Sequence, residues 1–331
     1  MLKSRRKIAC RRGVLEFGFY LPNSGEGAMP DALASIARLG DRLGFYCMVA
    51  PDHILMPRQV DSVYPYSVTG SILAGGNSGA GEWPEQITTL AYLAGVTENI
   101  RLVTSVMIVP YRNPLLCAKM LATLDMLSKG RLIVGAGVGW MEEEFELLDA
   151  PPFAERGAAT DEYLQAFIEL WTADNPSFEG KHVRFSDIIF LPKPAQTPHP
   201  PIWIGGQSRA ALRRAARLGN AWHPVGAIPA APLEPEELAE NLAYLHRYAE
   251  RAGRDPAEIQ VSMKAPLYDA SSDADGSRRR FSGSPDAVLE DIHAYAEVGV
   301  THLIFDFRSP HHAETEERMA RFAEEVMTAA K

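Results

Sequence analysis

Runs of apolar, β-branched or aromatic residues alternate along the chain with segments in which apolar positions recur at helical spacing. Eight such runs predict strands, at 14–21, 45–50, 101–109, 131–137, 201–205, 220–225, 258–265 and 301–307. Helical patterns follow each of them, beginning near residue 30 and continuing at 84–97, 113–129, 155–172, 207–218, 234–252, from 285 and after 307. This strict alternation predicts an α/β fold, a (β/α)8 TIM barrel.

The joints between these elements favour the same fold. Several predicted helices end on glycine or asparagine and run almost directly into the next strand, at Gly44, Asn99, Gly130, Gly219 and Gly299. We expect the long segments 51–83, 173–200 and 269–283 on the other side of the barrel, where the strands end. Short joints before the strands and long loops after them are typical of barrel enzymes, whose chemistry lies at the carboxyl ends of the strands.

Two of the predicted helices are strongly apolar. The helix at 113–129 has Asn113 as its expected N-cap and Pro114 at its first position. Its spacing predicts inward-facing side chains at Leu116, Met120, Leu124 and Leu127. This helix and the one at 84–97 either form the isologous interface of a homodimer or pack only against the barrel.

Composition narrows the class of protein. The 331 residues are 46% apolar and 23% charged, with no change in composition that would mark a second domain, so we expect one domain over 14–331 behind a flexible N-terminal extension, 1–13. The net charge of −9 argues against general binding to nucleic acid or an anionic membrane, and no stretch approaches the length of a membrane span. The three cysteines and nine histidines have no metal-ligand spacing, which favours a reduced, cytoplasmic protein without a metal site.

The segment "RLIVGAGVGW" (131–140) places glycines at 135, 137 and 139 directly after a predicted strand. A dinucleotide-binding Rossmann turn would come near the first strand, with an acidic residue closing the next strand about twenty residues later. Here the glycines follow the fourth strand, and the next strand begins only near 201. They therefore indicate a barrel loop in which a ligand ring lies close to the backbone.

A pair of adjacent glycines lies in "IGGQSRAALRRAA", where a strand leads into a helix. Backbone N–H groups at the helix N-terminus, together with its dipole, form a natural phosphate site. The candidate residues are Gly205, Gly206, Gln207 and Ser208, with Arg209 as a possible cation beside them. The alternatives are an ordinary tight turn and, for the arginine, a solvated helix face.

Several motifs together resemble the bacterial-luciferase-like flavin monooxygenase superfamily. They are "TSVMIVPYRNPLLCAKMLATLDMLSKGRLIVGAGVGWMEEEFE", "PKPAQTPHPPIWIGGQS" and "AARLGNAWHP", and the resemblance spans residues 14 to about 310. The likeness is strongest to the branch that uses the deazaflavin coenzyme F420. It implies the same barrel, a small-molecule substrate, and two-electron transfer through F420 or, alternatively, FMN, bound at the mouth with its phosphate in the glycine turn.

The resemblance also implies roles for individual residues. A non-prolyl cis peptide at Ser105–Val106 would support the ring, and Asp52 and His53 would contact the coenzyme, with His53 serving the proton step. The backbone of Gly137 and Gly139 would lie beside the ring, with Trp140 or Glu143 near the coenzyme. The chain departs from the sugar-phosphate dehydrogenases of the branch, because Trp140 stands where they have a catalytic glutamate. This departure weakens any expectation of the same substrate.

Further polar residues end later strands, namely Trp222, His223, Lys264, Asp306 and Arg308, for which catalysis and packing are equally open. The function that we expect is an F420-dependent oxidoreductase that transfers a hydride to or from a small organic substrate. The alternatives are a monooxygenase that uses reduced FMN and oxygen, and a non-catalytic flavin-binding barrel.

Overall fold

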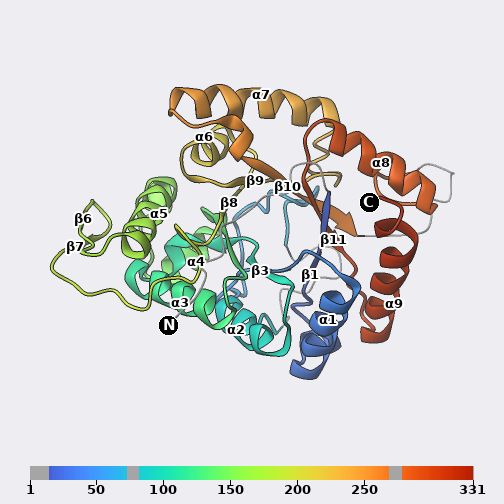
Figure 1. The fold of residues 1–331 in the computed structure, drawn as a ribbon, viewed down its shortest axis with the longest axis horizontal. Coiled ribbons are helices and arrows are strands. Elements are labelled where there is room, and N and C mark those ends of the chain that lie inside the picture. The colour runs from blue at the N-terminus through green and yellow to red at the C-terminus, as the bar shows by residue number, and fades with distance from the viewer. Residues whose placement is uncertain (1–14, 73–81, 268–277, 331) are drawn as a thin grey trace.

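The computed structural model describes residues 15–72, 82–267 and 278–330, and these residues form a closed barrel of parallel strands (Figure 1). Its strands are β1 (Glu16–Tyr20), β2 (Cys47–Ala50), β3 (Arg101–Thr104), β4 (Met107–Ile108), β5 (Leu132–Gly137), β8 (Ile202–Gly205), β9 (Ala221–His223), β10 (Gln260–Leu267) and β11 (His302–Asp306). Since β3 and β4 are two parts of one barrel strand, the barrel has the eight parallel strands that the hydrophobic pattern predicts.

Closure comes from the pairing of β3 with both β2 and β5. From β2 the sheet continues through β1, β11, β10, β9 and β8 back to β5, and every pairing is parallel. All carboxyl ends of the strands consequently meet at one mouth, where side chains from distant parts of the sequence come together.

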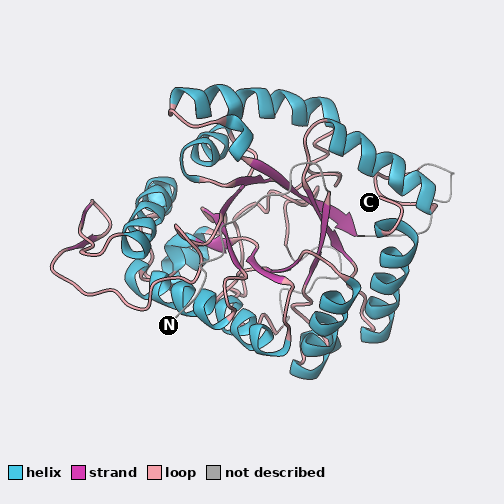
Figure 2. Cartoon of the chain, in the orientation of Figure 1, coloured by secondary structure: helices cyan, strands magenta, loops and turns pink. Residues whose placement is uncertain are grey.

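Helices surround the barrel as a ring (Figure 2). They are α1 (Pro30–Leu43), α2 (Gln86–Val96), α3 (Pro114–Leu127), α4 (Glu142–Leu147), α5 (Arg156–Thr172), α6 (Arg209–Leu218), α7 (Pro235–Arg251), α8 (Pro285–Glu297) and α9 (His312–Phe322). The N-cap expected from the sequence is present at α3, where Asn113 accepts hydrogen bonds from backbone N–H groups of the first turn, and Ser284 caps α8 in the same way.

The core has two layers. The larger layer lies between the strands and the helices, and a smaller cluster fills the barrel interior, made by Cys47, Val49, Val103, Ile133, Trp203, Ala221 and Ile304. The interior is packed with side chains, so the space available to a ligand lies above it, at the mouth.

The structure differs from the sequence-based expectation in three places. The strand expected at 101–109 is broken after Thr104, and the peptide bond between Ser105 and Val106 is cis, as the resemblance implied. The expected position of 173–200 after a strand is wrong, because this stretch connects α5 to β8 and so lies before a strand; it contains a short hairpin, β6 (Phe178–Glu179) and β7 (Arg184–Phe185), whose strands are too short to be recognised in the sequence. On α3, the expectation for Leu116 and Leu127 is wrong, because both are more than half exposed, whereas Leu124 is buried.

Two expectations concern residues that lie wholly or partly outside the described ranges. The N-terminal extension 1–13 lies wholly outside them, as does Cys10, while Cys47 and Cys117 are buried free thiols. Within the described part of the chain, no helix is long and apolar enough to cross a bilayer.

Candidate functional site

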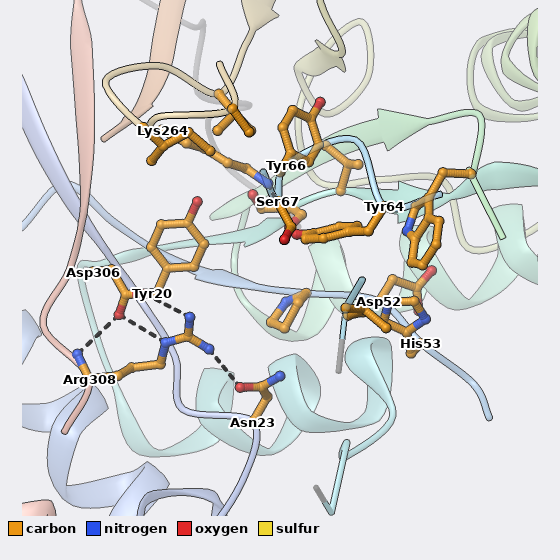
Figure 3. Close-up of a pocket in the computed structure, with 18 of the residues that line it drawn as sticks. Tyr20, Asn23, Asp52, His53, Tyr64, Tyr66, Ser67, Lys264, Asp306 and Arg308 are labelled. Carbon is orange, nitrogen blue, oxygen red and sulfur yellow. Dashed lines mark hydrogen bonds and ion pairs between the residues drawn. The ribbon is translucent and has the colours of Figure 1, made fainter. Parts of the chain in front are cut away.

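A cavity of about 570 Å³ opens at the mouth of the barrel. Its walls come from the carboxyl ends of β1, β2, β3, β5, β9, β10 and β11 and from the segment that follows β2. Figure 3 shows Asp52 and His53 on one side of it and Lys264, Asp306 and Arg308 on the other. We call these sides the His53 end and the Lys264 end, and we call Ser105 and Val106, which lie between them, the floor.

Asp52 is buried, and both of its carboxylate oxygens are used. Arg112 donates to them through Nη1 and Nη2 at 2.8 Å each, and the backbone N–H of Ile108 donates to Oδ2 at 2.8 Å. Arg112 also donates to Glu85 at 2.7 Å. Asp52 therefore joins the end of β2 to β4, just beyond the floor, through the hydrogen bond from Ile108, and to Arg112 through a bidentate ion pair.

His53 has a buried carboxylate behind it. Its Nδ1 lies 2.8 Å from Oε2 of Glu144, a side chain with no exposed surface. Oε1 of Glu144 accepts from the backbone N–H groups of Ile54 and Leu55, and Oε2 also accepts from the hydroxyl of Tyr111. Since the carboxylate accepts at Nδ1, that nitrogen carries the proton, and Nε2 is the nitrogen without a partner among the described residues.

The floor is fixed from below through Ser105. Its Oγ lies 3.0 Å from Nε2 of His223, and its carbonyl oxygen accepts from Nζ of Lys264 at 3.0 Å. Nδ1 of His223 lies 2.6 Å from the carbonyl oxygen of Ser262, so it donates there and Nε2 accepts from Ser105. Burial, followed by the charge of Lys264, holds the pKa of His223 well below its usual value, which keeps this imidazole neutral.

Glycines give Val106 its place in the floor. A Cβ atom added to Gly137 would lie 2.5 Å from Cγ2 of Val106, and one added to Gly205 would lie 2.8 Å from its Cγ1. Gly139 has a positive φ of 85°, and a Cβ there would lie 2.5 Å from the ring of Phe145. Neither Gly137 nor Gly139 lines the cavity, so their structural effect is to leave room for Val106 and Phe145.

At the Lys264 end the charges are arranged differently. The guanidinium of Arg308 donates to both oxygens of Asp306, at 2.8 and 2.6 Å, and to Oδ1 of Asn23 at 2.7 Å. Lys264 is 9% exposed, and burial together with the charge of Arg308 lowers its pKa to about 7. The ring of Tyr20 lies within 5.7 Å of both cations, and burial raises the pKa of its hydroxyl well above the usual value.

Aromatic rings form much of the wall. The ring of Trp83 lies 4.8 Å from that of His53, and the ring of Trp140 lies 5.0 Å from that of Tyr64. Nε1 of Trp83 is buried without a hydrogen-bond partner in the described structure. Glu143 does not line the cavity. Its Oε1 accepts from the backbone N–H groups of residues 61 and 62, which positions the segment that carries Tyr64.

The β8–α6 turn lies beside the cavity without lining it. Gly206 has a φ of 95°, and Ser208 caps α6 by accepting from the backbone N–H of residue 211. Gln207 donates to the carbonyl oxygen of Val225, a cavity residue. The guanidinium of Arg209 lies 4.2 Å from the ring centre of Tyr244 on α7, so its charge is directed away from the cavity.

The structure thus brings five of the predicted site residues to one cavity, namely Asp52, His53, Ser105, Val106 and Trp140. Lys264, Asp306 and Arg308, which the sequence left open, join them. Sequence reasoning missed Glu144 and Arg112. The signal for Glu144 was the run of three glutamates at 142–144, of which helical phase buries only the last. In the described part of the chain, no cluster of three or more potential metal ligands occurs.

Comparison with known proteins adds the family. The model for luciferase-like monooxygenases matches residues 15–278. An uncharacterized protein of Mycobacterium tuberculosis is 32% identical over 312 residues, which are 92% of this chain and 90% of that protein. The FMNH(2)-dependent dimethylsulfone monooxygenase of Pseudomonas putida is 37% identical over 147 residues, 44% of this chain and 40% of that enzyme.

A third relative uses the other cofactor. The F420-dependent glucose-6-phosphate dehydrogenase of Microbacterium testaceum is 25% identical over 355 aligned positions, covering 95% of this chain and 96% of that enzyme. Among solved structures, monooxygenase RslO1 from Streptomyces bottropensis matches with a TM-score of 0.77, 24% identity and 96% and 100% coverage. The F420-dependent tetrahydromethanopterin reductase of Methanopyrus kandleri matches with a TM-score of 0.73, 18% identity and the same coverage. The structural matches establish the fold.

Proposed function

Because the chain belongs to the luciferase-like monooxygenase family, whose members are oxidoreductases, we propose that it is an F420-dependent oxidoreductase acting on a small organic substrate. The observation that carries the proposal is the convergence of Asp52, His53, Ser105 and Trp140 on one cavity. These residues follow three separate strands, and they are four of the residues to which the sequence resemblance gave coenzyme contacts.

The cavity fits a tricyclic ring. Its volume of about 570 Å³ lies inside the usual range for organic ligands, roughly 300–1,000 Å³. Val106 offers an apolar floor, and the indoles of Trp83 and Trp140 offer flat walls. Nε1 of Trp83, a donor, and Nε2 of His53, an acceptor, have no partner among the described residues, so they are hydrogen-bonding groups for a ring that carries carbonyl oxygens and N–H groups. Bound there, the deazaflavin would supply two electrons as a hydride.

The chain's own residues have separate tasks in this proposal. His53 accepts and returns a proton at Nε2, because Glu144 holds the other ring proton on Nδ1. Asp52 positions β4, which continues from the floor, by accepting from the backbone N–H of Ile108, and Arg112 holds the Asp52 carboxylate in place. Backbone N–H groups of the turn from Gly205 to Arg209 bind the phosphate, since the turn opens a ten-residue helix beside the cavity.

A second candidate is a monooxygenase that uses reduced FMN and oxygen. The similarity to the dimethylsulfone monooxygenase of P. putida favours it, although that similarity covers less than half of either chain. Titrating the protein separately with F420 and FMN, each oxidised and reduced, distinguishes the two. We expect tighter binding of F420 and consumption of reduced F420 by a carbonyl compound without oxygen uptake. Preference for FMN with oxygen uptake would overturn the proposal, and tight binding without turnover of any compound would indicate a non-catalytic barrel.

Two substitutions make this test specific to the cavity. Val106→Trp puts an indole into the cavity above the floor, so it should abolish cofactor binding. The control is Gly95→Ala on α2, where no atom lies within 4 Å of the added methyl group, so binding should be unchanged. His53→Ala should retain binding and lose most of the turnover. If both are unaltered, the role given to His53 is wrong.

We also propose that the protein is a homodimer formed through α2 and α3. Tyr92 on α2 and Leu116, Met126 and Leu127 on α3 are all more than 40% exposed, which is costly for apolar side chains in water. Sedimentation of the wild type against Leu116→Lys tests this, because a charge there should shift a dimer to a monomer.

A further inference from the structure

Lys264 differs from the other buried cations of this protein in what surrounds it. Arg112 is paired with Asp52, and Arg214 with Asp161. Lys264 is more than nine-tenths buried, yet no carboxylate among the described residues lies within ion-pair distance of it. A buried charge without a counter-ion is costly unless other groups compensate, so a specific reason for this lysine is required.

Hydrogen bonding does not supply that compensation. Arg131, which also lacks a carboxylate partner, donates to three backbone carbonyl oxygens and to the hydroxyl of Thr97. Lys264 has three N–H donors when charged, but in the described structure only one acceptor, the carbonyl oxygen of Ser105, lies within reach. Its other two donor positions belong to the cavity that it lines.

The groups that face Lys264 come from several strands. Arg308, on the segment after β11, disfavours the charged amine, and its partner Asp306 is engaged with that arginine. Tyr20 from β1 presents its ring, and His223 from β9 is neutral. Burial and Arg308 together lower the pKa of Lys264 to about 7, so the amine gives up and regains a proton near neutral pH.

We propose that Lys264 is the catalytic acid–base group for the substrate, giving its Nζ proton to the oxygen or nitrogen of a carbonyl or imine whose carbon receives the hydride. This inference rests on the proposed F420-dependent function. The C–H bond forms with the hydride pair from reduced deazaflavin, which is thereby oxidised. The π pair of the C=O or C=N bond takes the proton, the amine becomes neutral, and solvent reprotonates it.

Its position suits this task. Lys264 lies 3.0 Å from the floor carbonyl, at the end of the cavity opposite His53, so the two titratable groups can serve different partners. His53 stands beside the residues assigned to the coenzyme, and Lys264 stands beside Tyr20 and the polar set of Asn23, Asp306 and Arg308. A proton donor whose pKa is near the working pH gives the most effective general acid–base catalysis.

The first test needs neither cofactor nor substrate. The full-length protein is labelled with ¹³C at the lysine ε-carbons, and the NMR signal absent from Lys264→Met is followed with pH. We expect a midpoint near 7 for this signal. In Arg308→Leu the Lys264 midpoint should rise by at least one pH unit, because the neighbouring positive charge is gone and Asp306 is released. A Lys264 midpoint above 9 in the wild type would overturn the proposal.

The second test separates proton transfer from positioning. Lys264→Gln keeps an N–H donor for the Ser105 carbonyl but cannot titrate. With reduced F420 and benzaldehyde or cyclohexanone as probes, kcat should fall by about 10²–10⁴-fold, with F420 affinity within threefold and the wild-type decline in kcat above about pH 7 removed. Added methylamine should partly restore turnover in Lys264→Ala, and Lys181→Met should behave as wild type.

The outcomes distinguish the two proposals. Wild-type turnover in Lys264→Gln, or no rescue of Lys264→Ala by methylamine at any concentration, overturns the role of Lys264 alone. Failure of the wild type to bind F420, with a Lys264 midpoint near 7, overturns the proposed function and the role that rests on it. If F420 binds but neither probe reacts, the NMR titration tests the role of Lys264. A midpoint near 7 supports that role, and a midpoint above 9 overturns it.

Discussion

His53 and Lys264 stand at opposite ends of one cavity and are supported in opposite ways. His53 donates to Glu144, whose carboxylate also accepts two backbone N–H groups and a tyrosine hydroxyl. Lys264 has a single carbonyl acceptor and, among the described residues, no carboxylate partner. The first arrangement fixes a ring and its tautomer, and the second leaves an amine free to change its protonation state. Titratable residues of similar position in a barrel can therefore have unlike tasks.

The largest expected effect comes from removing the support at the His53 end. Glu144→Ala leaves four donors in a buried site without their acceptor, so the free energy of unfolding should fall by about 3–5 kcal/mol. Urea denaturation measures this. Glu143→Ala is the matched control, because the neighbouring carboxylate is partly exposed and accepts only two backbone N–H groups, and its loss should cost about 1 kcal/mol. Equal losses of stability in the two variants would contradict the role of Glu144 as the buried acceptor that supports the His53 end.

The floor between the two ends provides the next test. Gly137→Ala should push Val106 toward the cavity, lowering stability by about 1–3 kcal/mol and cofactor affinity by about tenfold. Val106→Ala should recover most of both losses in the double variant, because it removes the Cγ2 atom that lies 2.5 Å from the added methyl group. Additive effects in a double-mutant cycle would show that Val106 is not what Gly137 accommodates.

The barrel interior below both ends gives a pH-dependent comparison. His302 is 2% exposed, and burial, followed by the charge of Arg101, lowers its pKa to about 3. The unfolded chain binds a proton at this histidine below about pH 6.5 and the folded protein does not, so stability falls as pH drops from about 6.5 toward 3. At pH 5 the loss from this group is about 2 kcal/mol. His302→Gln should flatten that part of the stability profile in thermal unfolding at pH 7 and pH 5. An unchanged slope would mean that His302 is protonated in the fold.

The smallest effect is expected at the β8–α6 turn, outside the cavity. Arg209 is directed onto Tyr244, so Arg209→Gln should change cofactor affinity by less than threefold if backbone N–H groups alone bind the phosphate. Isothermal titration with F420 measures this. A loss of tenfold or more would show that the guanidinium turns toward the cofactor phosphate, and the turn would then resemble the Lys264 end in presenting a cation to a ligand.

The sequence predicted the barrel because alternation of short apolar runs and helical patterns is repeated over the whole chain, so errors at single elements did not matter. It also predicted that Asp52, His53, Ser105 and Trp140 would meet, because the carboxyl ends of parallel strands share one mouth. It did not predict Glu144 or Arg112, because their importance depends on which side chains a helix buries against a loop. Leu116 and Leu127 were misplaced for a related reason. An apolar helix does not reveal from its spacing alone which of its faces meets the barrel.

Arg112 joins Asp52, at the start of the segment that follows β2, to Glu85, at the N-cap of α2. One guanidinium therefore ties together the two stems of an excursion of more than thirty residues, while the strands beneath are paired independently of it. Because the entropy of closing a loop grows only slowly with its length, the part of this segment between residue 62 and Glu85 can change in length at little entropic cost, whereas the part from His53 to residue 62 is held by Glu144 and Glu143. Substrate range could then be altered by grafting this part of the segment from a relative, provided that Asp52, Arg112 and Glu85 are kept.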